Sequence, residues 1–172
     1  MFEPAKGVPD ERKNDMKSRL AVIVIIVLVS MSVGAKEKRK AAGGGFMQQA
    51  FAAWNSHDPD KVISYYKEDV AYEDVAYGAV NHGRAELRKF AAGFMEAVPD
   101  LRLEVVSSSI HNGHGVAEWV LSGTDKGLYK TGKKFSVRGA SVFEMRGGKC
   151  SSNKDFYDLA TIMRQVGVLP AQ

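Results

Sequence analysis

The residues best suited to chemistry lie between Val70 and Phe90, in the sequence VAYEDVAYGAVNHGRAELRKF. Alternation predicts a strand that carries Tyr72 and Asp74 on one face. A glycine-containing loop follows, and then a helix with an apolar stripe. A carboxylate at the end of a strand can face a cavity that the next helix covers, and partial burial raises its pKa toward that of a proton-transfer base. Asp74 is therefore a candidate base, although Asp also starts turns for structural reasons alone.

A second group of polar residues lies in the last predicted strand. Period-two alternation places Asn153, Asp155 and Tyr157 on one face. Lys154 and Phe156 fall on the opposite face. Either the Asp or the Lys must then face the interior, unless a bulge intervenes. The residues by themselves leave these two alternatives open.

The elements that must position these residues change character at Asp100. Before it, three helices are predicted over residues 46–56, 59–66 and 84–97, and Asp58-Pro59 gives the second a strong start signal. After it, apolar residues alternate along four long strands joined by turns such as Asn112-Gly113. A short helix, 159–165, closes the chain. Helices segregated from strands favour the α+β class, with one sheet face covered by helices.

Charge argues against a nucleic-acid partner. The chain has 172 residues and a net charge of +4. Most of that excess lies in Lys36–Lys40, whereas residues 41–172 carry fifteen basic and fifteen acidic side chains. A neutral domain lacks the electrostatic footprint that phosphate backbones require. We therefore expect no nucleic-acid binding.

The N-terminal segment predicts export. The apolar run Leu20–Ala35 follows basic residues and ends in small ones, as in a secretory signal, and Met16 could be its true start. We expect residues 1–35 to be a signal peptide cleaved after Ala35, which would place the protein outside the cytoplasm, secreted or periplasmic. Residues 36–45 form a linker and residues 46–172 the domain. An uncleaved membrane anchor is the alternative, although the run is short for a span.

Motifs for other chemistries are missing from the sequence. It contains no H-E-x-x-H, paired C-x-x-C, P-loop or G-x-G-x-x-G. Cys150 is the only cysteine, so an intrachain disulfide is impossible, and we expect it to be a buried structural residue. We expect neither a cofactor nor a metal.

Six segments of the chain form a pattern when they are taken in order: AFAAWNSHDPDKVISYY, VAYEDVAYG with HGRAELRKF, VPDL, WVLSGT, TGKKFSVRG and KDFYDLATIMRQVGVLP. Together they resemble the polyketide cyclase (SnoaL-like) branch of the nuclear transport factor 2-like superfamily, which is related to ketosteroid isomerases. The resemblance covers about residues 46–170. It implies a cone-shaped barrel, in which a strongly curved antiparallel sheet wraps around the N-terminal helices and encloses one deep pocket. It also implies a homodimer.

The resemblance assigns roles to the two aspartates. Asp74 matches the proton-transfer base of ketosteroid isomerases, and Asp155 matches the acid/base of polyketide cyclases. The oxyanion-binding Tyr and Asp of the isomerases correspond to Ala50 and Ser141, so steroid isomerase activity is not expected. His82 is expected near the pocket rim. The expected substrate-binding residues are Tyr72, His82, Trp54, Trp119, Asn153, Tyr157 and Ser141.

Two functions follow from the sequence. The first is a cofactor-independent lyase or isomerase, similar to polyketide cyclases, that moves a proton on an apolar carbonyl compound. The second is a non-catalytic module that uses the same fold to bind a small apolar ligand or to dimerise. The first requires Asp74 and Asp155 to face one cavity, and the second predicts that these carboxylates form surface ion pairs.

Overall fold

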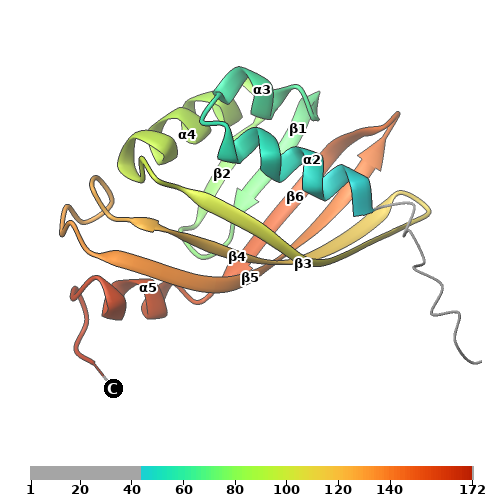
Figure 1. Cartoon of the computed structure of the whole chain (residues 1–172). Helices are drawn as coiled ribbons and strands as arrows, with labels where there is room; N and C mark the ends of the chain where they lie inside the picture. Colours follow the sequence, from blue (N-terminus) through green and yellow to red (C-terminus); the bar gives the residue numbers. More distant parts are fainter. Residues whose placement is uncertain (1–43, 172) are drawn as a thin grey trace, which may run out of the picture. The chain divides into compact units, whose positions relative to one another are not determined.

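The computed structural model describes residues 44–171, which form one curved sheet; the first three described helices lie on one side of it, and the short C-terminal helix lies on the other side, below the sheet in the view of Figure 1. The helices are α2 (Gly44–Asn55), α3 (Pro59–Ile63), α4 (Gly83–Ala97) and α5 (Leu159–Gln165). The strands are β1 (Tyr66–Asp74), β2 (Ala79–His82), β3 (Arg102–His111), β4 (His114–Thr124), β5 (Lys134–Arg146) and β6 (Lys149–Tyr157).

The sheet has six strands in the order β2-β1-β6-β5-β4-β3. Strands β3 to β6 form an antiparallel meander, as the alternation predicted. β1 lies parallel to β6 and antiparallel to β2. The α+β class and the cone-like architecture are confirmed, and the sheet remains open, with β2 and β3 as its edges. The parallel pairing of β1 and β6 was not predicted.

Three boundaries differ from the sequence prediction. Helix α2 begins at Gly44, so two residues of the predicted linker are helical. Helix α3 has the predicted cap, in which the Asp58 carboxylate accepts hydrogen bonds from the next turn, but it ends at Ile63. Tyr66 therefore starts strand β1 rather than closing a helix. Residues 79–82, predicted as loop, form strand β2.

The core lies between the helices and the inner face of the sheet. Along β4, Ala117, Trp119 and Leu121 are buried while the residues between them are more exposed, which is the pattern of a strand covered on one face. From the helical side, Trp54 of α2 and Leu87 of α4 are buried in the same cluster. Tight packing of this cluster leaves room for only a small internal cavity, described below.

The predicted signal peptide and most of the predicted linker, residues 1–43, lie outside the described part of the chain. Within residues 44–171, every helix is too short or too polar to cross a membrane.

Cys150 is buried, as expected, and burial raises the pKa of its thiol to about 12. Such a thiol is a poor nucleophile, which agrees with a structural role.

Candidate active site

The parallel contact between β1 and β6 brings the two candidate carboxylates together. In the strand register, Tyr72 lies opposite Asn153, and Asp74 lies opposite Asp155. Side chains opposite each other in a sheet point to the same face. Both aspartates line the same cavity, and neither forms an ion pair with another described residue.

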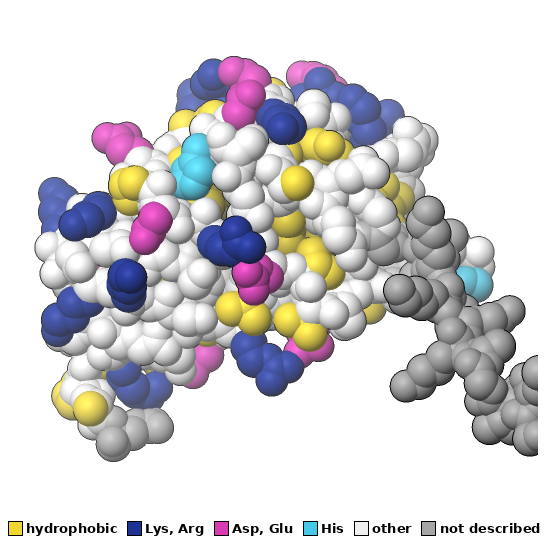
Figure 2. Space-filling view, in the orientation of Figure 1, with side chains coloured by type: hydrophobic (Ala, Val, Ile, Leu, Met, Phe, Trp, Pro, Cys, Tyr) yellow, Lys and Arg dark blue, Asp and Glu magenta, His cyan; other side chains and the backbone are white. Residues whose placement is uncertain are grey.

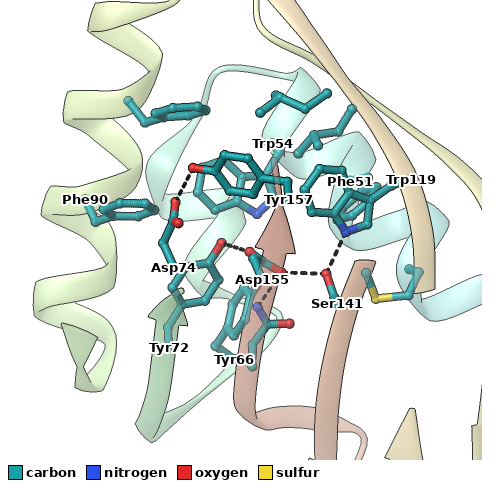
Figure 3. Close-up of a pocket in the computed structure, with 15 residues that line it drawn as sticks. Phe51, Trp54, Tyr66, Tyr72, Asp74, Phe90, Trp119, Ser141, Asp155 and Tyr157 are labelled. Carbon is teal, nitrogen blue, oxygen red and sulfur yellow. Dashed lines mark hydrogen bonds between the residues drawn. The ribbon is translucent and has the colours of Figure 1, made fainter. Parts of the chain in front are cut away.

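Each carboxylate is held by a tyrosine from the opposite strand (Figure 3). The Tyr72 hydroxyl of β1 donates a hydrogen bond to Asp155 of β6. The Tyr157 hydroxyl of β6 donates to Asp74 of β1 at 2.9 Å. Two Tyr–Asp pairs therefore cross between neighbouring strands. The pairs follow from Tyr-x-Asp in β1 beside Asp-x-Tyr in β6, because period two puts all four side chains on one face.

Asp155 sits at the centre of a larger network. One oxygen, Oδ1, accepts from the Ser141 hydroxyl at 2.5 Å and from the Asn153 amide at 2.9 Å. The Trp119 indole nitrogen donates to the Ser141 hydroxyl at 2.8 Å, which fixes that hydroxyl from behind. The other oxygen accepts from Tyr72. Three side chains thus hold the Asp155 carboxylate in one orientation, and Trp119 supports one of them.

The surroundings raise the pKa of both aspartates. For Asp155, burial has the largest effect, and the hydrogen bonds from Ser141, Tyr72 and Asn153 oppose it only in part. The nearby negative charge of Asp74 raises the pKa of Asp155 further. For Asp74, burial also dominates, against hydrogen bonds from the Tyr77 backbone and from Tyr157. Two carboxyls with raised pKa values in one cavity are suited to acid–base catalysis.

The cavity is narrow and mostly apolar. Its volume is about 50 Å³, enough for a few atoms of a ligand. Apart from the two aspartates, the described residues that line it carry no charge. They are Met47, Phe51, Trp54, Tyr66, Tyr72, Asp74, Phe90, Phe94, Leu103, Trp119, Leu121, Ser141, Asn153, Asp155 and Tyr157.

Two further side chains with donor groups line the cavity, Trp54 and Tyr66, and they are hydrogen-bonded to each other. The hydrogen bonds to Asp74 and Asp155 come from other groups, so neither donor is used by a carboxylate. Burial raises the pKa of Tyr66 well above its usual range, which keeps its hydroxyl protonated. The Tyr66 hydroxyl, which accepts from Trp54, can donate to a carbonyl oxygen that gains negative charge.

The structure places most of the predicted site residues at this cavity. Those that line it are Asp74, Asp155, Tyr72, Trp54, Trp119, Asn153, Tyr157 and Ser141. His82 does not, which corrects the expectation for the rim. It is exposed at the start of α4, where its backbone N–H donates to Glu86 at 2.7 Å. The short strand β2 turns this residue away from the interior.

Sequence reasoning missed Tyr66 as a site residue, because the helix signal at Asp58-Pro59 was extended too far. Tyr66, Val70, Tyr72 and Asp74 are all buried, but Glu68, at the same period-two spacing, is exposed, where the register with β6 shifts between residues 66 and 71. That irregularity conceals the strand in a simple period-two count. Phe90 and Phe94 were predicted to form the apolar face of the helix, and the structure shows that this face also lines the cavity.

Comparison with known proteins identifies a family for this chain. The SnoaL-like domain family matches residues 47–153. Cyclase aurE from Calcarisporium arbuscula is 34% identical over 85 residues, which cover 49% of this chain and 62% of that protein. The matched segment thus spans less than two thirds of that cyclase.

Solved structures show the same fold. A protein of ketosteroid isomerase-like fold from Catenulispora acidiphila DSM 44928, in complex with trimethylamine, superposes with a TM-score of 0.66. It is 24% identical and covers 71% of this chain and 92% of its own. A protein assigned as a SnoaL-like polyketide cyclase from Jannaschia sp. CCS1 superposes with a TM-score of 0.64. It is 16% identical and covers 73% of this chain and 92% of its own.

Proposed function

This chain belongs to the SnoaL-like domain family, and on that premise we propose that it is a cofactor-independent cyclase or isomerase. It would move a proton beside the carbonyl group of an apolar small molecule. The observation that carries the proposal is the pair of aspartates on β1 and β6, which face one cavity and are each held by a tyrosine of the other strand. The matched relative that is a cyclase supports the reaction class.

Asp155 is the base in this proposal. In its ionised form it removes a proton from the carbon next to the carbonyl, and the electron pair moves onto the carbonyl oxygen. The Tyr66 hydroxyl, supported by its hydrogen bond with Trp54, is the donor available to that oxygen. Burial makes the Asp155 carboxylate a stronger base than an exposed one, and its hydrogen bonds keep it aimed at the substrate.

The second half of the reaction returns the proton. The enolate either attacks an electrophilic carbon of the same molecule, which closes a ring, or takes a proton at another carbon, which isomerises it. Asp155, now protonated, gives its proton back to the new oxygen or carbon, so the enzyme ends as it began. Asp74 with Tyr157 is a second proton acceptor or an orienting group at the side of the cavity nearer α4.

Asp155→Asn tests the proposal. The change keeps size and hydrogen bonding but removes proton transfer, so we expect a loss of about 10²–10⁴ in rate. The rate can be measured without the natural substrate, by following deuterium exchange beside the carbonyl of 2-tetralone in heavy water. Stability should stay similar or rise, because a buried charge is removed. Urea unfolding checks this.

Asp69→Asn is the matched control, because Asp69 is exposed and pairs with Arg146 away from the cavity. It should exchange the probe at the rate of the unmodified protein. If folded Asp155→Asn also does so, or if the unmodified protein does not exceed the buffer rate, the non-catalytic binding module becomes the better explanation. An Asp155→Asn chain that fails to fold would make Asp155 structural.

A further inference from the structure

Two larger grooves continue outward from the narrow cavity. The outer groove, about 330 Å³, is lined by Asp74, Tyr77, Ala79, Lys89, Phe90, Gly93, Phe94 and Leu128. It shares Asp74, Phe90 and Phe94 with the inner cavity. The distal groove, about 380 Å³, is lined by Gly93, Glu96, Ala97, Lys126, Gly127 and Lys130, and it meets the outer groove at Gly93. A path therefore runs from the aspartates along α4 to the β4–β5 loop.

The volumes show where a substrate must lie. Sites for small organic ligands usually measure about 300–1,000 Å³. The inner cavity of about 50 Å³ can take only the reacting end. The rest of the molecule must occupy the outer groove, whose walls include the stacked rings of Phe90 and Phe94 with centroids 6.2 Å apart. At Gly93 an added Cβ would meet nothing within 4 Å, so the helix surface is open there.

Charge changes along this path. The inner cavity carries only acidic groups, whereas the grooves add three lysines, Lys89, Lys126 and Lys130, against one further acid, Glu96. None of the three lysines forms an ion pair with another described residue. Figure 2 shows Lys and Arg side chains gathered at the end of the domain where the β4–β5 loop lies. The domain as a whole is nearly neutral, so this grouping is local.

The β4–β5 loop holds two of the lysines in place. Its centre is Asp125, fully buried, whose carboxylate accepts from the backbone N–H groups of Tyr129, Lys130 and Thr131 and from the Thr131 hydroxyl. The backbone N–H groups of Lys126 and Gly127 both donate to Ala97 of α4 at 2.9 Å. The loop is therefore fixed to itself and to the helix.

Lys130 has a backbone φ of 60°. This left-handed conformation is costly for a residue with a Cβ, and lysine is not a residue that favours it. Strain of this kind persists only where the surroundings enforce it, and it often marks a functional site. Here the Asp125 hydrogen bonds enforce it, and the distal groove is lined by Lys130 as a result.

We propose that the grooves bind an anionic group on the substrate, so that the substrate is an apolar carbonyl compound with a negative charge at its far end. This inference rests on the function proposed above. The carbonyl reaches the aspartates, the apolar body lies on Phe90 and Phe94, and the anion lies at Lys126 and Lys130, with Lys89 beside the path. The lysines would then select the substrate and fix its direction in the site.

Two dyes that share an aromatic body test the proposal. 8-Anilino-1-naphthalenesulfonate carries a fixed anion, and N-phenyl-1-naphthylamine is the same body without it. In the double variant Lys126→Gln/Lys130→Gln we expect the dissociation constant of the sulfonate to rise about 3- to 10-fold. The dissociation constant of the neutral dye should not change. Raising the salt concentration from about 0.02 M to about 0.5 M should weaken binding of the sulfonate dye only, and only in the unmodified protein.

Lys67→Gln/Lys149→Gln is the matched control, because it removes the same charge near the opposite end of strand β5. It should leave both dyes unaffected. Phe156→Ser, on the outer face of the sheet, should also leave both unaffected and so exclude dye binding there. Lys126→Gln/Lys130→Gln with unchanged sulfonate binding overturns the anion subsite. Equal weakening of both dyes also overturns it, because the lysines would then only shape the groove.

Failure here is separable from failure of the proposed function. If binding of the sulfonate dye does not depend on Lys126 and Lys130 while deuterium exchange of 2-tetralone still depends on Asp155, the acid–base site is supported and the anion subsite is not. If the exchange does not depend on Asp155, the proposed function fails whatever the dyes show.

Discussion

At the scale of single residues, the two tyrosines set the protonation of carboxylates that belong to the other strand. Burial favours the neutral acid, whereas a phenol that donates to the carboxylate favours its ionised form. A hydrogen bond to a charged group contributes about 1.5–3 kcal/mol, so it can offset much but not all of such a burial cost. Burial therefore leaves the pKa of Asp155 raised, while the hydrogen bonds hold its carboxylate in one orientation. A buried Asp without these donors would be a neutral acid and no base.

The pH dependence of catalysis should report this balance. Asp155 must be ionised to act as a base, and burial raises its pKa, so kcat/KM should rise with pH along an acid limb above the ordinary Asp value of 3.8. The Tyr72 hydrogen bond lowers that pKa. Tyr72→Phe should therefore move the acid limb to higher pH. Profiles of 2-tetralone exchange against pH measure the shift.

Tyr157→Phe is the comparison for this prediction. Its hydroxyl donates to Asp74, not to Asp155, so the acid limb should move less than in Tyr72→Phe. An acid limb in Tyr72→Phe that stays in place or moves to lower pH would mean that Asp155 is not the titrating base. A fall in rate at every pH, in addition to the shift, would indicate that Tyr72 also positions the Asp155 carboxylate.

At the scale of elements, local patterns predicted most of the strands and helices but not the pairing of β1 with β6. The meander after Asp100 was predictable because apolar residues alternate along each strand and Asn112-Gly113 closes a hairpin. Alternation also placed Asp74 beside Tyr72 on one strand face, but it left Asp155 and Lys154 as alternatives for the interior, and the family resemblance chose Asp155. The parallel contact of β1 with β6 was not predictable, because it joins segments far apart in the chain and has no local signal. The crossed Tyr–Asp pairs depend wholly on that contact.

Strand β5 supports the site through a glycine. A Cβ added at Gly139 would lie 2.2 Å from the Trp119 ring, so only glycine allows the ring to lie on this strand. Trp119 in turn holds Ser141, which holds Asp155. We expect Gly139→Ala to destabilise the domain by about 1–3 kcal/mol through overpacking and to reduce probe exchange. Urea unfolding and the 2-tetralone assay measure the two effects.

Gly93→Ala serves as the control for Gly139→Ala. Gly93 lies in helix α4, where a Cβ would meet open space, so alanine should stabilise the helix by about 0.5–1 kcal/mol. A harmless Gly139→Ala, with full stability and full exchange, would show that Trp119 can move without disturbing Asp155. The contacts that lead from Gly139 through Trp119 and Ser141 to Asp155 would then make no contribution to catalysis.

At the scale of the whole molecule, the outer face of the sheet has an apolar surface. Val116, Val142 and Phe156 are 53%, 50% and 43% exposed, and Val116 lies opposite Val142 in neighbouring strands. Charged residues such as Glu118 and Arg138, which form an ion pair, lie beside them. We propose that two copies of the domain pair through this face, which would cover the apolar side chains.

Sedimentation analysis at tens of micromolar, about the range of weak protein interfaces, should then show a dimer. Val116→Glu/Val142→Glu places two charges at the centre of the face and should give a folded monomer. Val80→Glu, at the exposed edge strand β2, changes an equally exposed valine and should remain dimeric. A monomeric unmodified protein at these concentrations contradicts the proposal.

The crossed Tyr–Asp pairs also determine when the site forms during folding. Tyr72 and Asp155 are 83 residues apart, as are Asp74 and Tyr157, so each pair closes most of the domain into one loop. Contacts of such long range form late, because the chain must first lose the entropy of that loop. A nascent chain that has emerged as far as the β4–β5 loop holds Tyr72 and Asp74 without their partners in β6 and can move no proton. In refolding, exchange of 2-tetralone should return with the slowest phase, after the fluorescence of Trp54 and Trp119, and simultaneous return would show that β1 and β6 meet early.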